Sequence, residues 1–515
     1  MLHYLEQELR NQRGNAIRAT IENVSRRGVL GGLLTTTGLV LAIDFSPAAA
    51  REVVKTYPTG GDGMPNKTVN NPKVFIAIDK DGTVTIMSHR AEMGTGISTS
   101  LPMVVADEME ADWSKVKIVT TDGDEPKYGN QDTDGSRSMR HFIQAMRQCG
   151  AAARAMLEAA AAKKWGVDAT QCKAQNHKVM GPDGKSADFG ELVEIAAGLP
   201  VPDVKTLKLK DPSEFRYIGR DIPLVDGPNM SVGKAIYGMD LRLPGMVYSV
   251  VEHCPVTYGK VKSVDASEAM KVPGVIKIVE IPQSAPPIGF NSLGGVAVIA
   301  NSTWAANEGR KKLKIDWDYG ANVVYNSEDF RVSMENTAKA DGNKVVRQEG
   351  DVAAALAGAD KVVEATFYVP HFAHAMMEPP VALAQVKDGK CDVWGGYQDP
   401  QAARGTVAKA IGMDEADVTT HVTLLGGGFG RRSKPDFAAE AAILAKQLGV
   451  PVKNVWTRED DIQHAYYHTV CAQHIKASLK DGKVTGWLHR SVFPTIWSTF
   501  EDDPQLGHKI ELSLG

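Results

Sequence analysis

The sequence has few cysteines, no excess of charge and no long apolar run. Five cysteines occur among 515 residues, and no two form a C-x-x-C pair. This excludes a disulfide framework and a cysteine-ligated iron–sulfur cluster within the chain. Lys and Arg number 58 against 62 Asp and Glu, a balance that predicts no nucleic-acid partner. Any redox centre is therefore expected to be a bound cofactor or to belong to a partner subunit.

Residues 1–50 are predicted to be a targeting segment. Arg26 and Arg27 precede an uncharged run over 28–43, which is shorter than the ~20 apolar residues that a membrane span needs. Small residues at 46–50 then offer a peptidase site. This order is typical of the twin-arginine signal, which exports folded proteins. We therefore expect a periplasmic protein and leave attachment to the inner membrane open. A buried helix with an incidental arginine pair is the weaker interpretation.

The rest of the chain is predicted to be α+β. A hairpin is expected over 73–87, helices over 98–111 and 138–165, and polar connectors over 200–223 and 320–348. The third region alternates strands and helices, so parallel strand pairs are expected there. Residues 487–493 have the pattern of a buried strand, and no closing helix follows. The sequence therefore predicts an end inside a domain. The three regions between connectors span 71–200, 226–320 and 350–515.

Three glycine- and hydroxyl-rich turns, at residues 92–100, 133–138 and 425–433, each precede a predicted helix. Such a turn places unpaired N–H groups at a helix N-terminus, where anions bind. Ser433 and Asp436 are spaced as a capping box for the third helix. A single turn of this kind is usually only a tight turn, and none matches G-x-G-x-x-G or the P-loop. Three together predict a polyanionic organic cofactor held from several sides.

Two other patterns resemble metal sites, and we interpret both as structural. His371, His374 and Glu378 lie between Pro370 and Pro379, where a regular helix with one ligand face is not expected. The run from Asp132 to Gly135 resembles a calcium loop, but the twelfth position lacks an acidic residue. We therefore predict no protein-ligated metal.

An ordered set of motifs resembles a known family. The set comprises Glu92–Gly96, Ala106–Glu108, Gly135–Ser138, Gly150–Arg154, Gly233–Tyr237, Pro273–Val275, Ala373–Pro379, Trp394–Pro400, Gly426–Arg432 and Trp456–Asp460. It is similar to the molybdenum-cofactor-binding large subunit of the xanthine oxidase family, of the isoquinoline 1-oxidoreductase β-subunit and membrane-associated aldehyde dehydrogenase type. The resemblance implies part of the second molybdenum-cofactor domain at 71–200, an α/β hammerhead domain at 226–320, and an incomplete first cofactor domain at 350–515.

The resemblance also implies a set of site residues. Gln398 would hydrogen-bond an oxo ligand of the metal, and the N–H groups of Phe429 and Gly430 would face the same centre. The metal would be held by the dithiolene of the pterin, so no protein ligand is needed. The implied cofactor-binding residues are Gly94, Thr95, Gly96, Thr99, Gly135, Ser136, Arg137, Gln398, Gly427, Gly428, Phe429, Gly430 and Arg431.

The implied function is that of a molybdenum hydroxylase. Such a subunit binds molybdopterin, expected here as the cytosine dinucleotide, and hydroxylates an aldehyde or an N-heteroaromatic carbon with oxygen from water. Electrons leave through a small 2Fe–2S subunit and often a cytochrome c subunit. Ser433 replaces a substrate-binding Glu of purine-oxidising relatives, which argues against xanthine.

The catalytic Glu of the family lies in a Gly-x-Gly-Glu segment, which is not found before Gly515. We therefore expect that this chain alone does not turn over. A truncated, inactive exported fragment is the first alternative function. A nucleotide-dependent oxidoreductase that uses the turn at 426–430 alone is the second.

Overall fold

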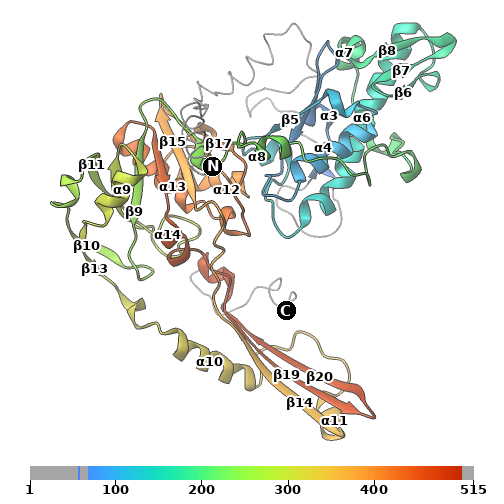
Figure 1. The fold of residues 1–515 in the computed structure, drawn as a ribbon. Helices are drawn as coiled ribbons and strands as arrows, with labels where there is room; N and C mark the ends of the chain where they lie inside the picture. Colours follow the sequence, from blue (N-terminus) through green and yellow to red (C-terminus); the bar gives the residue numbers. More distant parts are fainter. Residues whose placement is uncertain (1–55, 58–67, 501–515) are drawn as a thin grey trace, which may run out of the picture. The chain divides into compact units, whose positions relative to one another are not determined.

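The computed structural model describes residues 56–57 and 68–500 (Figure 1). The predicted signal segment and the end of the chain lie outside the described residues. Helices and strands alternate through the rest, which confirms the α+β prediction. The chain divides into two units, one formed by residues 1–247 and 381–453, and the other by residues 248–380 and 454–515.

The first unit starts with helices packed on a three-stranded sheet. Strand β4 pairs antiparallel with β3 and parallel with β5. The predicted hairpin is confirmed by the antiparallel pair β3–β4, but its first strand begins at Ile76 rather than at residue 73. Asn71 caps a short helix with Pro72 in its first turn, and this helix takes up residues 73–75. The elements up to α8 are β1 (Thr56–Tyr57), β2 (Thr68–Val69), α3 (Pro72–Phe75), β3 (Ile76–Ile78), β4 (Val84–Ser88), α4 (Ile97–Glu108), β5 (Val116–Thr120), α5 (Glu125–Tyr128), α6 (Arg137–Trp165), β6 (Lys173–Gln175), β7 (Lys178–Met180), β8 (Ser186–Asp188), α7 (Phe189–Ala197) and α8 (Gly227–Ser231).

Helix α6 confirms the longest predicted helix. It ends at Gly166, whose φ of 68° is left-handed, as expected for a glycine that closes a helix. Its apolar face, including Phe142 and Met156, is buried in the core of the first region. Gly150 lies against α4, where an added Cβ would come within 2.5 Å of the Val105 carbonyl oxygen. Close packing of α4 and α6 therefore requires glycine at this position.

The later part of the first unit is a second sheet with two helices. Strand β15 pairs antiparallel with β16, and β16 pairs parallel with β17, which confirms the expected parallel pairing. Helix α12 connects β16 to β17, and α13 packs on β15. The elements are β15 (Val381–Lys387), β16 (Lys390–Gly395), α12 (Pro400–Ile411), β17 (Val418–Val422), α13 (Asp436–Leu448) and β18 (Val452–Val455).

The second unit holds an antiparallel sheet in the order β11-β12-β9, covered by α9. Val250 and Val298 pack there against Ala305 and Ala306. A strand pair β10–β13 and a three-stranded sheet β14-β19-β20 complete the strands described for this unit. The elements are β9 (Val247–Glu252), β10 (Lys260–Asp265), β11 (Val275–Ile281), β12 (Gly295–Ala300), α9 (Thr303–Arg310), β13 (Lys314–Asp318), α10 (Ser327–Lys339), α11 (Val352–Ala357), β14 (Lys361–Val369), α14 (Arg458–Gln463), β19 (Cys471–Lys480) and β20 (Lys483–Val492).

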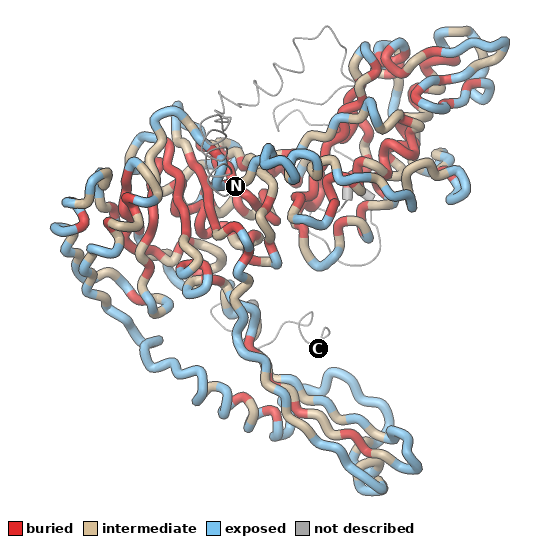
Figure 2. Tube along the Cα trace, in the orientation of Figure 1, coloured by how far each residue is buried: buried red, intermediate tan, exposed pale blue. Residues whose placement is uncertain are grey.

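Two predictions in this unit are wrong. The polar stretch 320–348 was expected to be a linker, yet it contains α10, which Asn326 caps. Most of α10 is exposed (Figure 2), and Met334 and Ala338 are its buried contacts. The strand around Trp487 was expected to be buried, but Trp487 is 57% exposed, because β20 pairs with β19 in a sheet with one open face.

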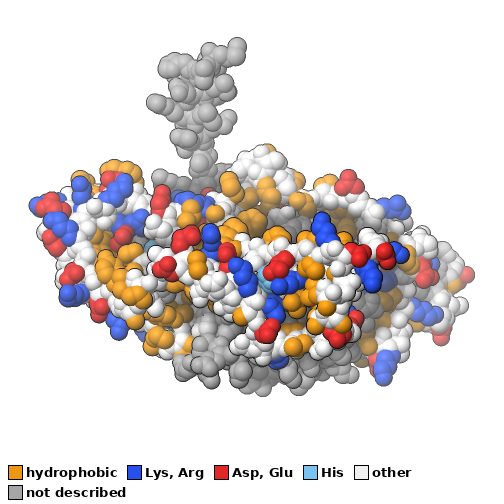
Figure 3. Space-filling view, turned by 90° about the horizontal axis from the view of Figure 1, so that it is seen from below, with side chains coloured by type: hydrophobic (Ala, Val, Ile, Leu, Met, Phe, Trp, Pro, Cys, Tyr) orange, Lys and Arg blue, Asp and Glu red, His pale blue; other side chains and the backbone are white. Residues whose placement is uncertain are grey.

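Charges are mixed on the surface. On the face drawn in Figure 3, basic and acidic side chains of the described residues are interspersed rather than gathered by sign. Within residues 68–500, none of the helices combines the length and apolar character that crossing a bilayer requires.

Candidate cofactor site

Gln398 joins two of the three predicted turns. Its side chain is buried, and its Nε2 donates to the Thr133 carbonyl oxygen at 2.8 Å, while its Oε1 accepts from the Gly430 N–H at 2.9 Å. Its backbone carbonyl accepts from the Thr133 N–H at 2.9 Å. Residues 265 positions apart in the chain are thereby held together. The structure thus brings Gln398 and the turns at 133–138 and 425–433 to one place.

The third turn has a backbone that few residues can adopt. Gly427 and Gly430 have φ values of 93° and 100°, and Phe429 has a φ of 53°. Positive φ in a bulky residue is strained, and such strain gathers at ligand sites. Phe429 is also 62% exposed. Gly428 lies directly against Gln398, where an added Cβ would come within 2.5 Å of Oε1.

The first turn joins the third through the Leu425 N–H, which donates to the Glu92 carbonyl oxygen at 3.0 Å. The expectation that its amides are unpaired is wrong. The buried carboxylate of Glu92 accepts from the N–H groups of Gly94 (2.8 Å), Gly96 (3.0 Å) and Ser98 (3.0 Å). A carboxylate of the chain therefore occupies the place expected for an external anion. Gly94 and Thr95 are exposed at the tip.

The Thr99 side chain also differs from the prediction. Thr99 is buried, and its hydroxyl accepts from the Val225 N–H at 3.0 Å. Of the residues predicted at the first turn, Gly94 and Thr95 are exposed, with the Gly94 N–H already bonded to Glu92, while Gly96 and Thr99 are buried.

Both arginines predicted to bind the cofactor are paired with carboxylates. Arg137 forms a salt bridge with Asp134 at 2.6 Å. Arg431 is fully buried and pairs with Asp436 at 2.8 Å, so its guanidinium lies inside the protein, which corrects the prediction. Since Asp436 is used in this pair, it does not form the predicted capping box, and Pro435 is the N-cap of α13. Ser433 instead donates to the Gly430 carbonyl oxygen.

Two carboxylates beside Gln398 were missed by the sequence analysis. Asp132 and Asp399 adjoin Thr133 and Gln398, the residues that pair across the turns. Burial raises the pKa of both carboxyls, and the charge of Asp399 raises the pKa of Asp132 further. Oδ1 of Asp132 is buried and has no hydrogen-bond partner among residues 68–500. A raised pKa in buried carboxyls is typical of groups that hold or move a proton.

His421 forms an ionic bridge within the first unit. Its Nδ1 lies 3.1 Å from Asp122 Oδ1 and its Nε2 lies 2.7 Å from Asp392 Oδ1, and its ring stacks on Trp394. Burial alone would lower the pKa of His421, but hydrogen bonds and charges from the two aspartates raise it to about 9. Protonated His421 therefore stabilises the folded chain.

We expect the contribution of His421 to the free energy of unfolding to be fully present below about pH 6.5 and to be lost as the pH rises through about 9. The shift corresponds to roughly 3 kcal/mol. His421→Gln should remove this part of the pH dependence, measured by urea unfolding between pH 6 and pH 10. An identical slope in both proteins would contradict the charge assignment.

The histidines interpreted as structural lie together in the second unit. The His374 ring is 4.4 Å from the His468 ring, and His371 Nδ1 is 3.2 Å from the His468 carbonyl oxygen. A cavity of about 650 Å³ also lies in this unit, lined by Cys254, Glu280 and Trp317 among others. None of the predicted site residues lines it, so its volume carries no argument for the cofactor.

Comparison with known proteins defines the class. Two family models, both described as a molybdopterin cofactor-binding domain, match residues 336–499 and 52–219. The chain is 30% identical to isoquinoline 1-oxidoreductase subunit beta of Brevundimonas diminuta, over 93% of this chain and 67% of that protein. It is 34% identical to the membrane-bound aldehyde dehydrogenase (pyrroloquinoline-quinone) of Gluconacetobacter polyoxogenes, over 88% and 58%.

Among solved structures, aldehyde oxidoreductase from Desulfovibrio gigas matches with a TM-score of 0.42 and 22% identity, over 57% of this chain and 37% of that one. The chain spans about three fifths to two thirds of the length of the two relatives above. The sequence relatives and the family models define a molybdopterin-binding protein. The chain belongs to the xanthine oxidase family, as a molybdenum-binding subunit.

Proposed function

We propose that this chain is the subunit of a molybdenum hydroxylase that carries molybdopterin cytosine dinucleotide and acts on an aldehyde or an N-heteroaromatic carbon. The observation that carries the proposal is the convergence of three glycine turns around Gln398. The side chain of Gln398 is hydrogen-bonded to the backbone of Thr133 and of Gly430, and the Leu425 N–H donates to the Glu92 carbonyl oxygen. A tight turn with no ligand would not need such partners from distant parts of the chain.

Some of the exposed residues in the turns are suited to bind a large anion. Gly135 and Ser136 are exposed at the start of α6, which has no side-chain cap, so their N–H groups would face pterin or pyrophosphate oxygens. In the third turn, Gly427–Gly430 would contact the same ligand. Glu92 and Asp134 neutralise nearby donors, which leaves neutral backbone dipoles and hydroxyls as the main contacts.

The residues around Gln398 would position the cofactor and a proton. When bound, the cofactor supplies the oxidation of the substrate carbon, with water as the source of oxygen. Gln398 uses one N–H for Thr133, and its second N–H is the donor assigned to the cofactor. Asp132 and Asp399 would hold a proton close to this place at neutral pH. Phe429, exposed and strained, would cover the ligand.

The partners and location remain part of the proposal. A small 2Fe–2S subunit and a cytochrome c subunit would receive the electrons, because the five cysteines here do not form a cluster motif. The twin arginine at 26–27 supports export to the periplasm after the cofactor is loaded. The similarity to isoquinoline 1-oxidoreductase subunit beta supports the heteroaromatic substrate class.

Metal and cofactor analysis tests the proposal. The full chain, purified from a host that makes the cofactor, is expected to contain about one molybdenum atom per chain and to release cytidine monophosphate on acid hydrolysis. Protein from a host that cannot make the cofactor is the control. Bound NAD or FAD, or pyrroloquinoline quinone in place of molybdenum, would contradict the proposal. Molybdenum without turnover, when the 2Fe–2S partner is supplied, would support the inactive alternative.

A further inference from the structure

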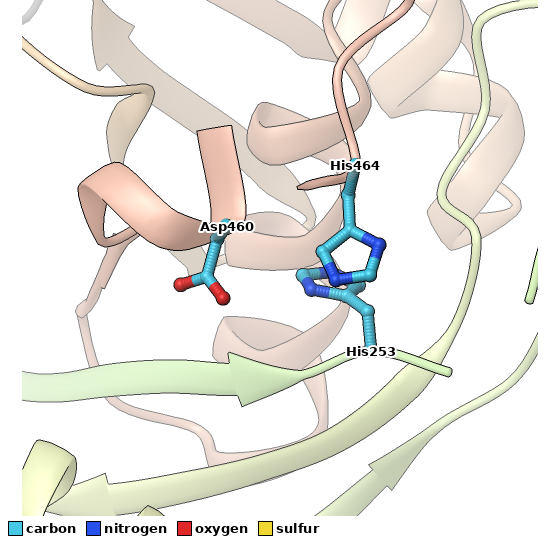
Figure 4. Close-up of side chains that lie close together, drawn as sticks. All are labelled: His253, Asp460 and His464. Atoms are coloured by element: carbon cyan, nitrogen blue, oxygen red, sulfur yellow. The ribbon is translucent and has the colours of Figure 1, made fainter. Parts of the chain in front are cut away.

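A second group of ligand-type side chains lies in the second unit, away from the turns. His253, Asp460 and His464 each offer one ligand atom, and these three atoms lie within 4.8 Å of one another. Figure 4 shows the carboxylate of Asp460 beside the two imidazole rings. We propose that these three residues bind a divalent transition-metal ion of the Zn²⁺ type.

Local structure brings the three residues together. Asp460 is the third residue of α14 and His464 is its C-cap. The His464 N–H donates to the Asp460 carbonyl oxygen at 2.8 Å, so the two residues lie one helical turn apart. Thr457 and Asp460 form the capping box that starts this helix, which fixes the Asp460 carboxylate. His253 follows β9, and its ring lies 4.8 Å from Trp456 and 4.9 Å from His464. The i, i+4 spacing is the sequence signal for this site.

The ligand set suits zinc. Two imidazole nitrogens and one carboxylate oxygen are a common three-residue set for Zn²⁺, with a fourth position left for water. Bonds of about 2.0–2.2 Å place tetrahedral ligands roughly 3.3–3.5 Å apart. The 4.8 Å limit observed here therefore requires a closure of about 1.5 Å at most, which side-chain rotation can supply. Softer sulfur ligands are not part of the set, so a Cu⁺ site is not favoured.

Arg310 is the competitor for Asp460, and its position is compatible with a metal. Its NH1 lies 2.7 and 2.8 Å from the two carboxylate oxygens of Asp460, and its Nε lies 3.3 Å from Glu252 Oε2. The single positive charge of Arg310 thus faces two carboxylates, and these three side chains together keep a net negative charge. Oδ2 of Asp460 also accepts from the N–H and the hydroxyl of Thr457, both at 2.8 Å. Oδ1 accepts from Arg310 and has a second acceptor position, so Asp460 can bind a metal through Oδ1 while it keeps Arg310 and Thr457. The neighbouring negative charge favours a cation.

A bound ion would connect two segments of the second unit. His253 belongs to the segment that starts at residue 248, and Asp460 to the segment that starts at residue 454. An ion that binds the folded chain alone stabilises it by an amount that rises with the logarithm of the ion concentration above the dissociation constant. We therefore expect zinc to raise the melting temperature, independently of molybdenum.

Zinc titration of the full chain tests this site. After treatment with a chelator, the protein is expected to bind one Zn²⁺ with a dissociation constant in the micromolar range or below. Co²⁺ in its place should give the visible absorption of a tetrahedral or five-coordinate centre. His464→Ala should weaken binding at least tenfold and remove the Zn²⁺-dependent rise in melting temperature. His489→Ala, which changes an exposed histidine on β20, is the matched control and should change neither.

His464→Cys separates ligation from folding, because a thiolate is also a zinc ligand. This variant should recover binding and shift the Co²⁺ spectrum toward a sulfur-ligated form. Failure of the unaltered chain to bind Zn²⁺ at 100 µM would overturn the site, as would equal affinity in His464→Ala. Molybdenum content is measured in the same samples, so loss of zinc binding is distinguishable from failure of the proposed enzyme function.

Discussion

Gly428→Ala is expected to reduce molybdenum content at least tenfold. The added methyl group would lie 2.5 Å from Oε1 and 2.9 Å from Cδ of Gln398, so either Gln398 or the turn must move. Gln398 is held by both Thr133 and Gly430, and its displacement would separate the second turn from the third. Molybdenum per chain, measured on protein that is folded by circular dichroism, reports the result.

Two controls make this prediction specific. Gly198→Ala should have no effect, because its Cβ would meet its nearest neighbour at an ordinary 3.6 Å. Overpacking costs about 1–3 kcal/mol, so the stability of Gly428→Ala is measured as well. In a Gln398→Ala background the same substitution should cost less, since the clashing amide is gone. Full molybdenum content in Gly428→Ala would show that the turns do not form the site.

Asp107→Asn is expected to lower the free energy of unfolding by about 3–5 kcal/mol, the usual cost of breaking a buried ion pair. Asp107 is fully buried at the end of α4 and binds the connector that follows the first region. It accepts from Lys210 Nζ at 2.9 Å and from the N–H groups of Tyr217 (2.8 Å) and Ile218 (2.9 Å). An asparagine NH₂ would face these donors, and the buried Lys210 would lose one of its carboxylate partners.

Urea unfolding at several pH values checks this prediction. Burial alone would raise the pKa of Asp107, but the backbone hydrogen bonds and Lys210 lower it below the ordinary value. Its contribution should therefore be present above about pH 4 and decline as the pH falls. Asp203→Asn, at an exposed cap of the same connector, should change stability by less than about 0.5 kcal/mol. If Asp107→Asn also lowered the free energy of unfolding by less than about 0.5 kcal/mol, the buried ion pair of Asp107 with Lys210 would not stabilise the fold as proposed.

Patterns of neighbouring residues in the sequence predicted the helices and turns whose conformation depends on those neighbours alone. Helix α6 follows from apolar spacing and a closing glycine, and the three turns follow from composition. Their convergence was implied by the resemblance, because the hydrogen bonds of Gln398 join residues that no local pattern relates. The same limit explains why Glu92 and Asp436 were not recognised as partners for the first turn and for Arg431. A carboxylate near donors in sequence gives no sign of which donors it will bind.

The missed acidic and metal-type groups depend on tertiary structure in the same way. Asp132 was considered only as part of a calcium loop. Asp399, whose charge raises the pKa of Asp132, belongs to the third region of the chain, so the two carboxylates are far apart in the sequence. His253 lies far from Asp460 in the sequence, and the two meet because β9 ends near α14. Helix α10 was missed for the opposite reason, since it has few buried apolar residues to produce a periodic pattern.

The hydrogen bonds of Gln398 also set an order of events during biosynthesis. Thr133 is made 265 residues before its partner, which at 5–20 residues per second is a delay of roughly 13–50 s. During this interval the loop at 133–138 lacks the strand, helix and glutamine that hold it. A binding site that needs both segments is therefore complete only after Gln398 and the turn at 425–433 have been synthesised.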